Sequence, residues 1–312
     1  MNLRANTIVS WVLLSISIPV YSQISGEMNL FKSEKGKAAI LSLYDKKLDS
    51  LGIAYNYETV NTSFGKTNVI VSGDTSNPPM ILVHGSNGCA PISLETYPNL
   101  HKTHRVYAVD VMAQPNKSAE VRLSMKDESY GAWMNELLTE LDLDSVTMAG
   151  FSFGGLVILK TLEFDESRVK EVFLSAPAYI VNGNPLKALF KVFIPMKRYM
   201  KTKQSKHIEK FLSEVFTDRD EFAVEYLSQV FLEFEMDFSP VPVINTKKAK
   251  SITTPITIFA AENDVIFPGK KMVKRAKKIF PSLKKIELIS ASKHVQNKAQ
   301  NHAIEQEILT SN

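Results

Sequence analysis

The sequence predicts an α/β protein: a mostly parallel central sheet flanked by helices, with an inserted helical cap. Three observations predict it. Short apolar runs rich in β-branched residues alternate with amphipathic helical stretches. Several of these runs are apolar throughout, as in residues 80–83, which is typical of strands covered on both faces. Between residues 176 and 254, the sequence shows only helical patterns.

The strands and helices follow one another along most of the chain. Strands are expected at residues 54–60, 68–72, 80–83, 106–109, 146–149, 172–175, 256–260 and 285–289. Helices are expected at residues 30–51, 129–141, 153–163, 268–279 and 297–309, where apolar residues recur at helical spacing. This alternation predicts right-handed crossovers between parallel strands. An antiparallel start from the two strands before Pro78 would make the sheet mixed.

The predicted cap occupies about residues 177–250 of a domain that spans residues 23–312. Its helical patterns cover residues 186–200, 206–216 and 220–234. Aromatic residues are frequent here, and we expect most of them to pack the core of the cap and the others to line a pocket. The lysines of residues 187–210 are expected to form a solvated face, with a basic rim for anionic substrates as the alternative.

Residues 1–22 have the layout of a secretory signal peptide. Arg4 precedes an apolar run over residues 8–20, and a small residue, Ser22, stands before a plausible cleavage point at Gln23. The run is short for a bilayer span, although an uncleaved anchor is the alternative. A periplasmic or secreted location in a bacterium is therefore expected. Cys89 is the only cysteine, so no intramolecular disulfide is possible.

Charge and residue spacing argue against a nucleic-acid partner and against a bound metal ion. The formal net charge is +4, and it falls to +3 if Arg4 is removed, which is too small to indicate a nucleic-acid partner. The pair His101 and His104 has metal-binding spacing, but no further residues complete a ligand set. No metal or organic cofactor is expected.

The chemistry is expected at Gly150-Phe151-Ser152-Phe153-Gly154, between a strand and a helix. A serine on so sharp a turn sits in strained backbone, and side chains at the two glycines would collide with the neighbouring strand and helix. This context predicts that Ser152 is a nucleophile.

Together with a second motif, this pentapeptide carries a family resemblance. His84-Gly85-Ser86-Asn87-Gly88 follows one strand, and Asp264 and His294 come after Ser152 in the order Ser, acid, His. The chain resembles the α/β-hydrolase superfamily from about Tyr55 to its C-terminus. The run from His84 through Asn116-Lys117-Ser118 is most similar to bacterial serine carboxylesterases.

The resemblance implies a role for each site residue. Among six histidines, His294 lies in a loop between the last strand and the last helix, which suits a catalytic base; His84 is expected to tie its loop by hydrogen bonds. Asp264 is the expected acid and Glu262 the alternative. The family also implies an oxyanion hole formed by the backbone N–H groups of Ser86 and Phe153.

One loop departs from the family's pattern. Many relatives have a glycine-rich turn after the fourth strand, whereas this chain has Asp110-Val111-Met112-Ala113-Gln114-Pro115. We therefore expect a stiffer pocket wall.

The implied activity is hydrolysis of small-molecule carboxylic esters through an acyl-enzyme intermediate. The alternatives are another triad hydrolase (thioesterase, lipase, C–C hydrolase or amidase) and a non-catalytic ligand-binding protein on the same scaffold. No stable membrane partner is expected after signal cleavage, and the sequence makes no prediction of the oligomeric state.

Overall fold

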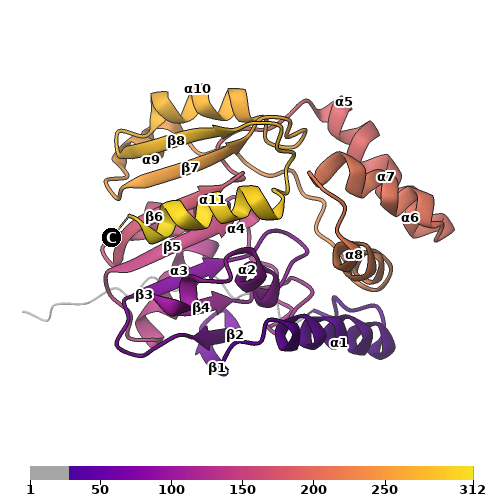
Figure 1. Cartoon of the computed structure of the whole chain (residues 1–312), viewed down its shortest axis with the longest axis horizontal. Helices are drawn as coiled ribbons and strands as arrows, with labels where there is room; N and C mark the ends of the chain where they lie inside the picture. Colours follow the sequence, from indigo (N-terminus) through magenta and orange to yellow (C-terminus); the bar gives the residue numbers. More distant parts are fainter. Residues whose placement is uncertain (1–27, 312) are drawn as a thin grey trace, which may run out of the picture.

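The central sheet has eight strands, as the sequence predicts. The computed structural model describes residues 28–311, and the sheet lies at the centre of that region (Figure 1). Its strands, in the spatial order β1-β2-β4-β3-β5-β6-β7-β8, are β1 (Tyr55–Thr62), β2 (Gly65–Ser72), β3 (Pro79–Val83), β4 (Arg105–Val109), β5 (Val146–Phe151), β6 (Val169–Ser175), β7 (Ile256–Ala261) and β8 (Leu283–Ile289). The first two strands pair antiparallel, and β2 pairs antiparallel with β4. All other pairs are parallel, so the predicted α/β-hydrolase fold class is confirmed.

Helices cover both faces of this sheet, because alternate strand residues point to opposite sides. In β3, Ile81 and Val83 belong to the buried cluster that also contains residues of α3 (Ser129–Glu140), α4 (Phe153–Phe164) and α10 (Gly269–Ile279). Met80 and Leu82 pack on the opposite face with α1 (Glu34–Ser50), α2 (Ala90–Thr96) and α11 (Lys298–Leu309). The short helices α2 and η1 (Leu100–Lys102) were not predicted, because neither is long enough to show a helical period.

The segment between β6 and β7 is helical. It contains α5 (Pro185–Ala188), a π-helical segment η2 (Leu189–Phe193), α6 (Ile194–Thr202), α7 (Ser205–Val215), α8 (Glu221–Glu233) and α9 (Thr246–Ser251). We refer to α5–α8 as the cap helices. They lie beside one end of the sheet in Figure 1, and the end of α7 reaches the loop after β8, where Phe216 and Val295 form a parallel bridge.

The aromatic residues of the cap helices divide into three groups. Phe211, Tyr226, Phe231 and Phe234 are buried, in agreement with the expectation that most such residues pack the core. Phe216 and Phe222 are half-buried against the same core cluster. Phe190 and Phe193 are exposed, which the sequence did not predict.

The N-terminal prediction lies outside the described region. Residues 1–22, with the expected signal peptide, precede residue 28, so both the cleavage and the exported location stay predictions. Within residues 28–311, none of the helices has the length and apolar character needed to cross a membrane.

Candidate active site

Ser152 occupies a strained turn between β5 and α4. Its backbone has φ 53° and ψ −113°, a conformation that side-chain-bearing residues rarely adopt. The turn is tight because its glycines let the chain pass close to its neighbours. A Cβ atom on Gly154 would lie 2.2 Å from the Val83 carbonyl oxygen, and one on Gly150 would lie 2.8 Å from the Gly154 carbonyl carbon. The sequence motif therefore forms the predicted strand–turn–helix elbow.

Ser152, His294 and Asp264 form one hydrogen-bonded chain. The Ser152 Oγ lies 2.9 Å from His294 Nε2, and His294 Nδ1 lies 2.6 Å from Asp264 Oδ2. They come together because they follow the carboxyl ends of the parallel strands β5, β8 and β7, which share one edge of the sheet. The structure thus brings the three residues that the sequence selected into one site.

Burial and packing hold the histidine ring in place. The side chain of His294 is 6 % exposed and that of Asp264 is fully buried. Phe151 and Phe267 pack against the imidazole, with ring centroids 5.1 Å and 5.5 Å from it. The carboxylate therefore contacts the imidazole in a water-poor environment, where a hydrogen bond to an ion is stronger than in bulk water.

The aspartate is itself oriented by backbone donors. Its Oδ1 accepts hydrogen bonds from the N–H groups of Ile266 and Phe267, which leaves Oδ2 facing the histidine. The alternative acid, Glu262, points elsewhere: its Oε2 accepts from the N–H of Ala291, and its Oε1 pairs with Lys270. Geometry therefore favours Asp264 over Glu262.

His84 fixes the loop that follows β3. Its Nε2 accepts the N–H of Val111, so Nδ1 carries the proton and donates to the Gly85 carbonyl oxygen at 2.8 Å. Burial lowers the pKa of His84 to about 4, so the ring is neutral near pH 7. This matches the structural role expected for His84.

The Gly85 carbonyl sets the direction of the Ser86 N–H, because both belong to one planar trans peptide. The carbonyl also accepts the Gly88 N–H at 3.1 Å, so it is held by two donors on one side of the loop. The Ser86 N–H points the opposite way and donates to no acceptor within residues 28–311. Phe153 is the first residue of α4, where a helix leaves its N–H without an internal acceptor.

A residue that the sequence did not select supports this loop. The side-chain Oε1 of Gln114 accepts the N–H of Asn87 at 2.7 Å, and Asn87 itself has φ 57°. Gln114 lies in the loop that lacks the family's glycines, and there Ala113 takes φ 53°. The only signal in the sequence was that departure, which pointed to the loop but not to its partner.

A pocket of about 500 Å³, counting its open mouth, adjoins the two predicted oxyanion donors. Ser86, Gln114, Tyr130, Phe153 and Phe234 line it, together with Arg122 and Asp237. Tyr130 packs edge-on against Phe153, with ring centroids 5.3 Å apart. The wall is thus formed jointly by the loops after β3 and β4, by α3 and by the end of α8.

A buried carboxylate anchors the loops behind this pocket. Asp110 accepts hydrogen bonds from Tyr44 of α1, Asn68 of β2 and the Ala90 N–H of α2. Burial raises its pKa to about 6, although the donors oppose this shift. The Asp110 carboxylate forms no hydrogen bond with Ser152, His294 or Asp264, and it ties three elements together. In the described part of the chain, no cluster of side chains is suited to hold a metal ion.

The sheet order and the serine–histidine–aspartate arrangement are typical of the α/β-hydrolase fold. The family model described as the alpha/beta hydrolase fold matches residues 78–220. Two curated relatives from Bacillus subtilis (strain 168) cover most of the chain. An uncharacterized carboxylesterase is 25% identical over 269 residues, 80% of this chain and 84% of its own. The carboxylesterase YbfK is 25% identical over 277 residues, 86% of this chain and 91% of its own.

Solved structures have the same architecture. A naproxen esterase (carboxylesterase NP) from Bacillus subtilis superposes with a TM-score of 0.77 at 22% identity, covering 89% of this chain and 98% of that one. Carboxylesterase CesB from the same organism gives 0.74 at 21% identity, covering 88% and 98%. The chain therefore has the α/β-hydrolase fold and is similar to carboxylesterases, so the resemblance drawn from its motifs is confirmed.

Proposed function

We propose that the chain hydrolyses carboxylic esters of small molecules through an acyl-enzyme intermediate. The observation that carries the proposal is the hydrogen-bonded chain from Ser152 through His294 to Asp264. A serine hydroxyl needs a base to remove its proton, and a histidine needs a carboxylate to hold its tautomer. The similarity to carboxylesterases supports the choice of ester substrates.

The reaction proceeds in two steps. Ser152 Oγ attacks the ester carbonyl while His294 Nε2 takes the hydroxyl proton, and the N–H groups of Ser86 and Phe153 stabilise the oxyanion. Collapse of the tetrahedral intermediate breaks the bond to the alcohol, which leaves with the proton from His294. A water molecule, deprotonated by the same histidine, then attacks the acyl carbon; the bond to Ser152 Oγ breaks, His294 returns the proton to the serine, and the acid is released. Asp264 stabilises the imidazolium in both steps.

Hydrolysis of short-chain p-nitrophenyl esters tests the nucleophile. Ser152→Ala should lose nearly all activity, because loss of the nucleophile in comparable triads costs about a million-fold in kcat. Ser167→Ala, at an exposed serine away from the site, is the matched control and should keep the parent rate. A Ser152→Ala enzyme that retained more than a few per cent of the rate would rule out the proposed nucleophile.

A second pair of variants tests the acid. Asp264→Asn should lower kcat by roughly ten-thousand-fold, because the amide favours the wrong histidine tautomer. Glu262→Gln keeps the histidine contacts unchanged and should retain activity. Parent protein that neither turned over esters nor reacted with a fluorophosphonate would instead favour a non-catalytic ligand-binding protein. An ester, thioester and amide panel separates the other triad hydrolases.

A further inference from the structure

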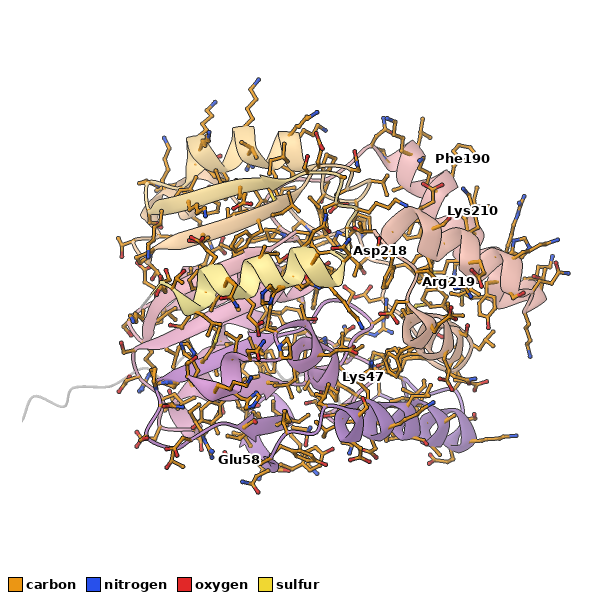
Figure 2. All side chains as sticks on the ribbon, viewed as in Figure 1. Lys47, Glu58, Phe190, Lys210, Asp218 and Arg219 are labelled. Carbon is orange, nitrogen blue, oxygen red and sulfur yellow. The ribbon has the colours of Figure 1, made fainter. Side chains whose placement is uncertain are left out.

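The first cap helices expose a stripe of large apolar side chains. Leu186, Leu189, Phe190 and Phe193, which we call the cap stripe, have exposed fractions of 65 %, 42 %, 65 % and 39 %. Their spacing of three, four and seven residues places them along one side of a helix. Val192, Met196 and Tyr199 of the same continuous helix are buried, so the stripe faces away from the protein. Figure 2 shows Phe190 on the outer part of the cap helices.

Cations accompany the cap stripe. Residues 185–210 contain eight lysines and arginines but one glutamate, whereas the whole chain has a net charge of only +4. Two of these lysines, Lys191 and Lys210, pair with Glu214. The other six are exposed and form no ion pair with any residue of the described region: Lys187, Lys197, Arg198, Lys201, Lys203 and Lys206.

The cap stripe continues toward the mouth of the active-site pocket. Phe193 lies 6.3 Å from Phe238, between ring centroids, and the Lys197 ammonium sits 4.2 Å from the Phe238 ring centre. Phe238 is 39 % exposed, and its two neighbours in the chain, Asp237 and Ser239, line the pocket. A surface that covered the stripe would therefore lie next to the pocket entrance.

Basic charge alone does not distinguish this face. Helix α10 is also rich in exposed lysines, among them Lys274 and Lys278, but no large hydrophobic residue is exposed on it. Within residues 28–311, the cap helices are the only elements that combine an apolar stripe with flanking cations. This combination suits the boundary between the headgroups and acyl chains of an anionic bilayer, where apolar side chains insert and cations meet phosphate groups.

We propose that the cap stripe docks the protein reversibly onto anionic phospholipid membranes, with the pocket mouth beside the lipid surface. Leu186, Leu189, Phe190 and Phe193 enter the acyl boundary, and the six unpaired cations contact lipid phosphates. The contact is peripheral, so it differs from the stable membrane partner that the sequence argued against. Membrane binding extends the proposed function but does not depend on it, because docking requires no catalysis.

Vesicle co-sedimentation of the full chain tests the docking. Parent protein should bind vesicles of equal parts phosphatidylglycerol and phosphatidylcholine at least tenfold more tightly than pure phosphatidylcholine, since each cation near an anionic surface adds to the attraction. Leu186→Ser/Phe190→Ser should weaken binding to the mixed vesicles at least tenfold. Any binding by residues 1–27 is common to the parent and the variants, so it cancels when the proteins are compared on the same vesicles.

The charge contribution is isolated by two variants with equal changes in net charge. Lys187→Glu/Lys201→Glu, on the cap, should weaken binding at least about tenfold. Lys274→Glu/Lys278→Glu, on α10, should change it less than about threefold. All six positions are exposed and outside the pocket, so thermal melting and hydrolysis of water-soluble esters should stay at parent levels.

Three results would overturn the proposal. One is a parent protein that binds neutral and anionic vesicles equally. Another is an equal loss of binding in the cap and α10 charge variants, which would show non-specific charge attraction. The third is a parent dimer that Leu186→Ser/Phe190→Ser converts to monomer without changing vesicle binding, which would show that a second copy covers the stripe. Loss of esterase activity with intact docking would count against the proposed function alone.

Discussion

Replacing Ser152 by glycine should stabilise the protein relative to replacing it by alanine. Both variants lose the hydroxyl and its 2.9 Å hydrogen bond to His294. The loss of that bond is therefore the same in both and does not contribute to the difference in their stability. They differ in the Cβ atom, and that atom makes φ 53°, ψ −113° unfavourable. Glycine adopts positive φ without steric cost.

The size of the effect follows from three contributions. A residue held in a sparsely populated backbone region costs about 1–3 kcal/mol. Against this, glycine loses more entropy on folding, by about 0.4–1 kcal/mol. Removing the buried methyl group costs at most about 0.8 kcal/mol more, at a residue that is 7 % exposed. About 1 kcal/mol is left in favour of Ser152→Gly over Ser152→Ala, or roughly 2 °C in Tm.

Urea unfolding and thermal melting of the two purified variants measure this difference. The matched control is Ser213, an exposed residue inside α7, where Ser213→Gly should be less stable than Ser213→Ala by about 1 kcal/mol. The sign of the alanine–glycine difference should therefore reverse between the two sites. A Ser152→Gly protein that was no more stable than Ser152→Ala would show that the turn carries no such strain.

Two further predictions concern the loop after β3. Because the pKa of His84 in the folded protein, about 4, lies below its usual 6.5, the stabilisation from the neutral ring is complete above pH 6.5 and is lost as pH falls toward 4, by about 3 kcal/mol. The urea midpoint should therefore fall less between pH 7 and pH 4.5 in His84→Gln than in the parent. The raised pKa of Asp110 has the opposite effect on stability, but Asp110 is present in both proteins, so its contribution cancels. If the urea midpoints of the two proteins changed equally with pH, the neutral state assigned to His84 would be wrong. In a p-nitrophenyl ester assay, Gln114→Met should lower kcat by up to about tenfold with little change in KM, because it removes the acceptor of the Asn87 N–H. A change confined to KM would instead assign Gln114 to substrate binding.

Local patterns were sufficient for the sheet and for Ser152, whereas the family resemblance gave Asp264 and His294 their expected roles. Most of the central strands are short apolar runs that are buried in the sheet, as in β3 and β7, so the residues of each run were enough to predict a strand. Ser152, Asp264 and His294 each follow a strand, and parallel strands bring their carboxyl ends to one edge of the sheet. The positions of the three residues at the ends of predicted parallel strands therefore predicted that they meet at one edge of the sheet.

Contacts between distant loops had no comparable signal. Gln114 supports Asn87 across a gap of 27 residues, and Asp110 joins α1, β2 and α2. Nothing in the residues around Gln114 identifies its partner, because such a hydrogen bond depends on how two loops are placed by the strands that they follow. The sequence indicated an unusual loop, and only the structure supplied what the loop does.

The orientation of the first cap helix was hidden from the sequence for a different reason. Residues 186–200 contain two sets of apolar positions, one with Leu186 and Phe190 and the other with Val192 and Met196. Periodicity predicts that a helix has apolar sides, but it does not say which of them faces the core. The fold buries Val192 and Met196 and leaves Leu186 and Phe190 outside. Folding therefore accounts for one set, and the exposed set, next to unpaired lysines and the pocket mouth, is explained by binding to a membrane.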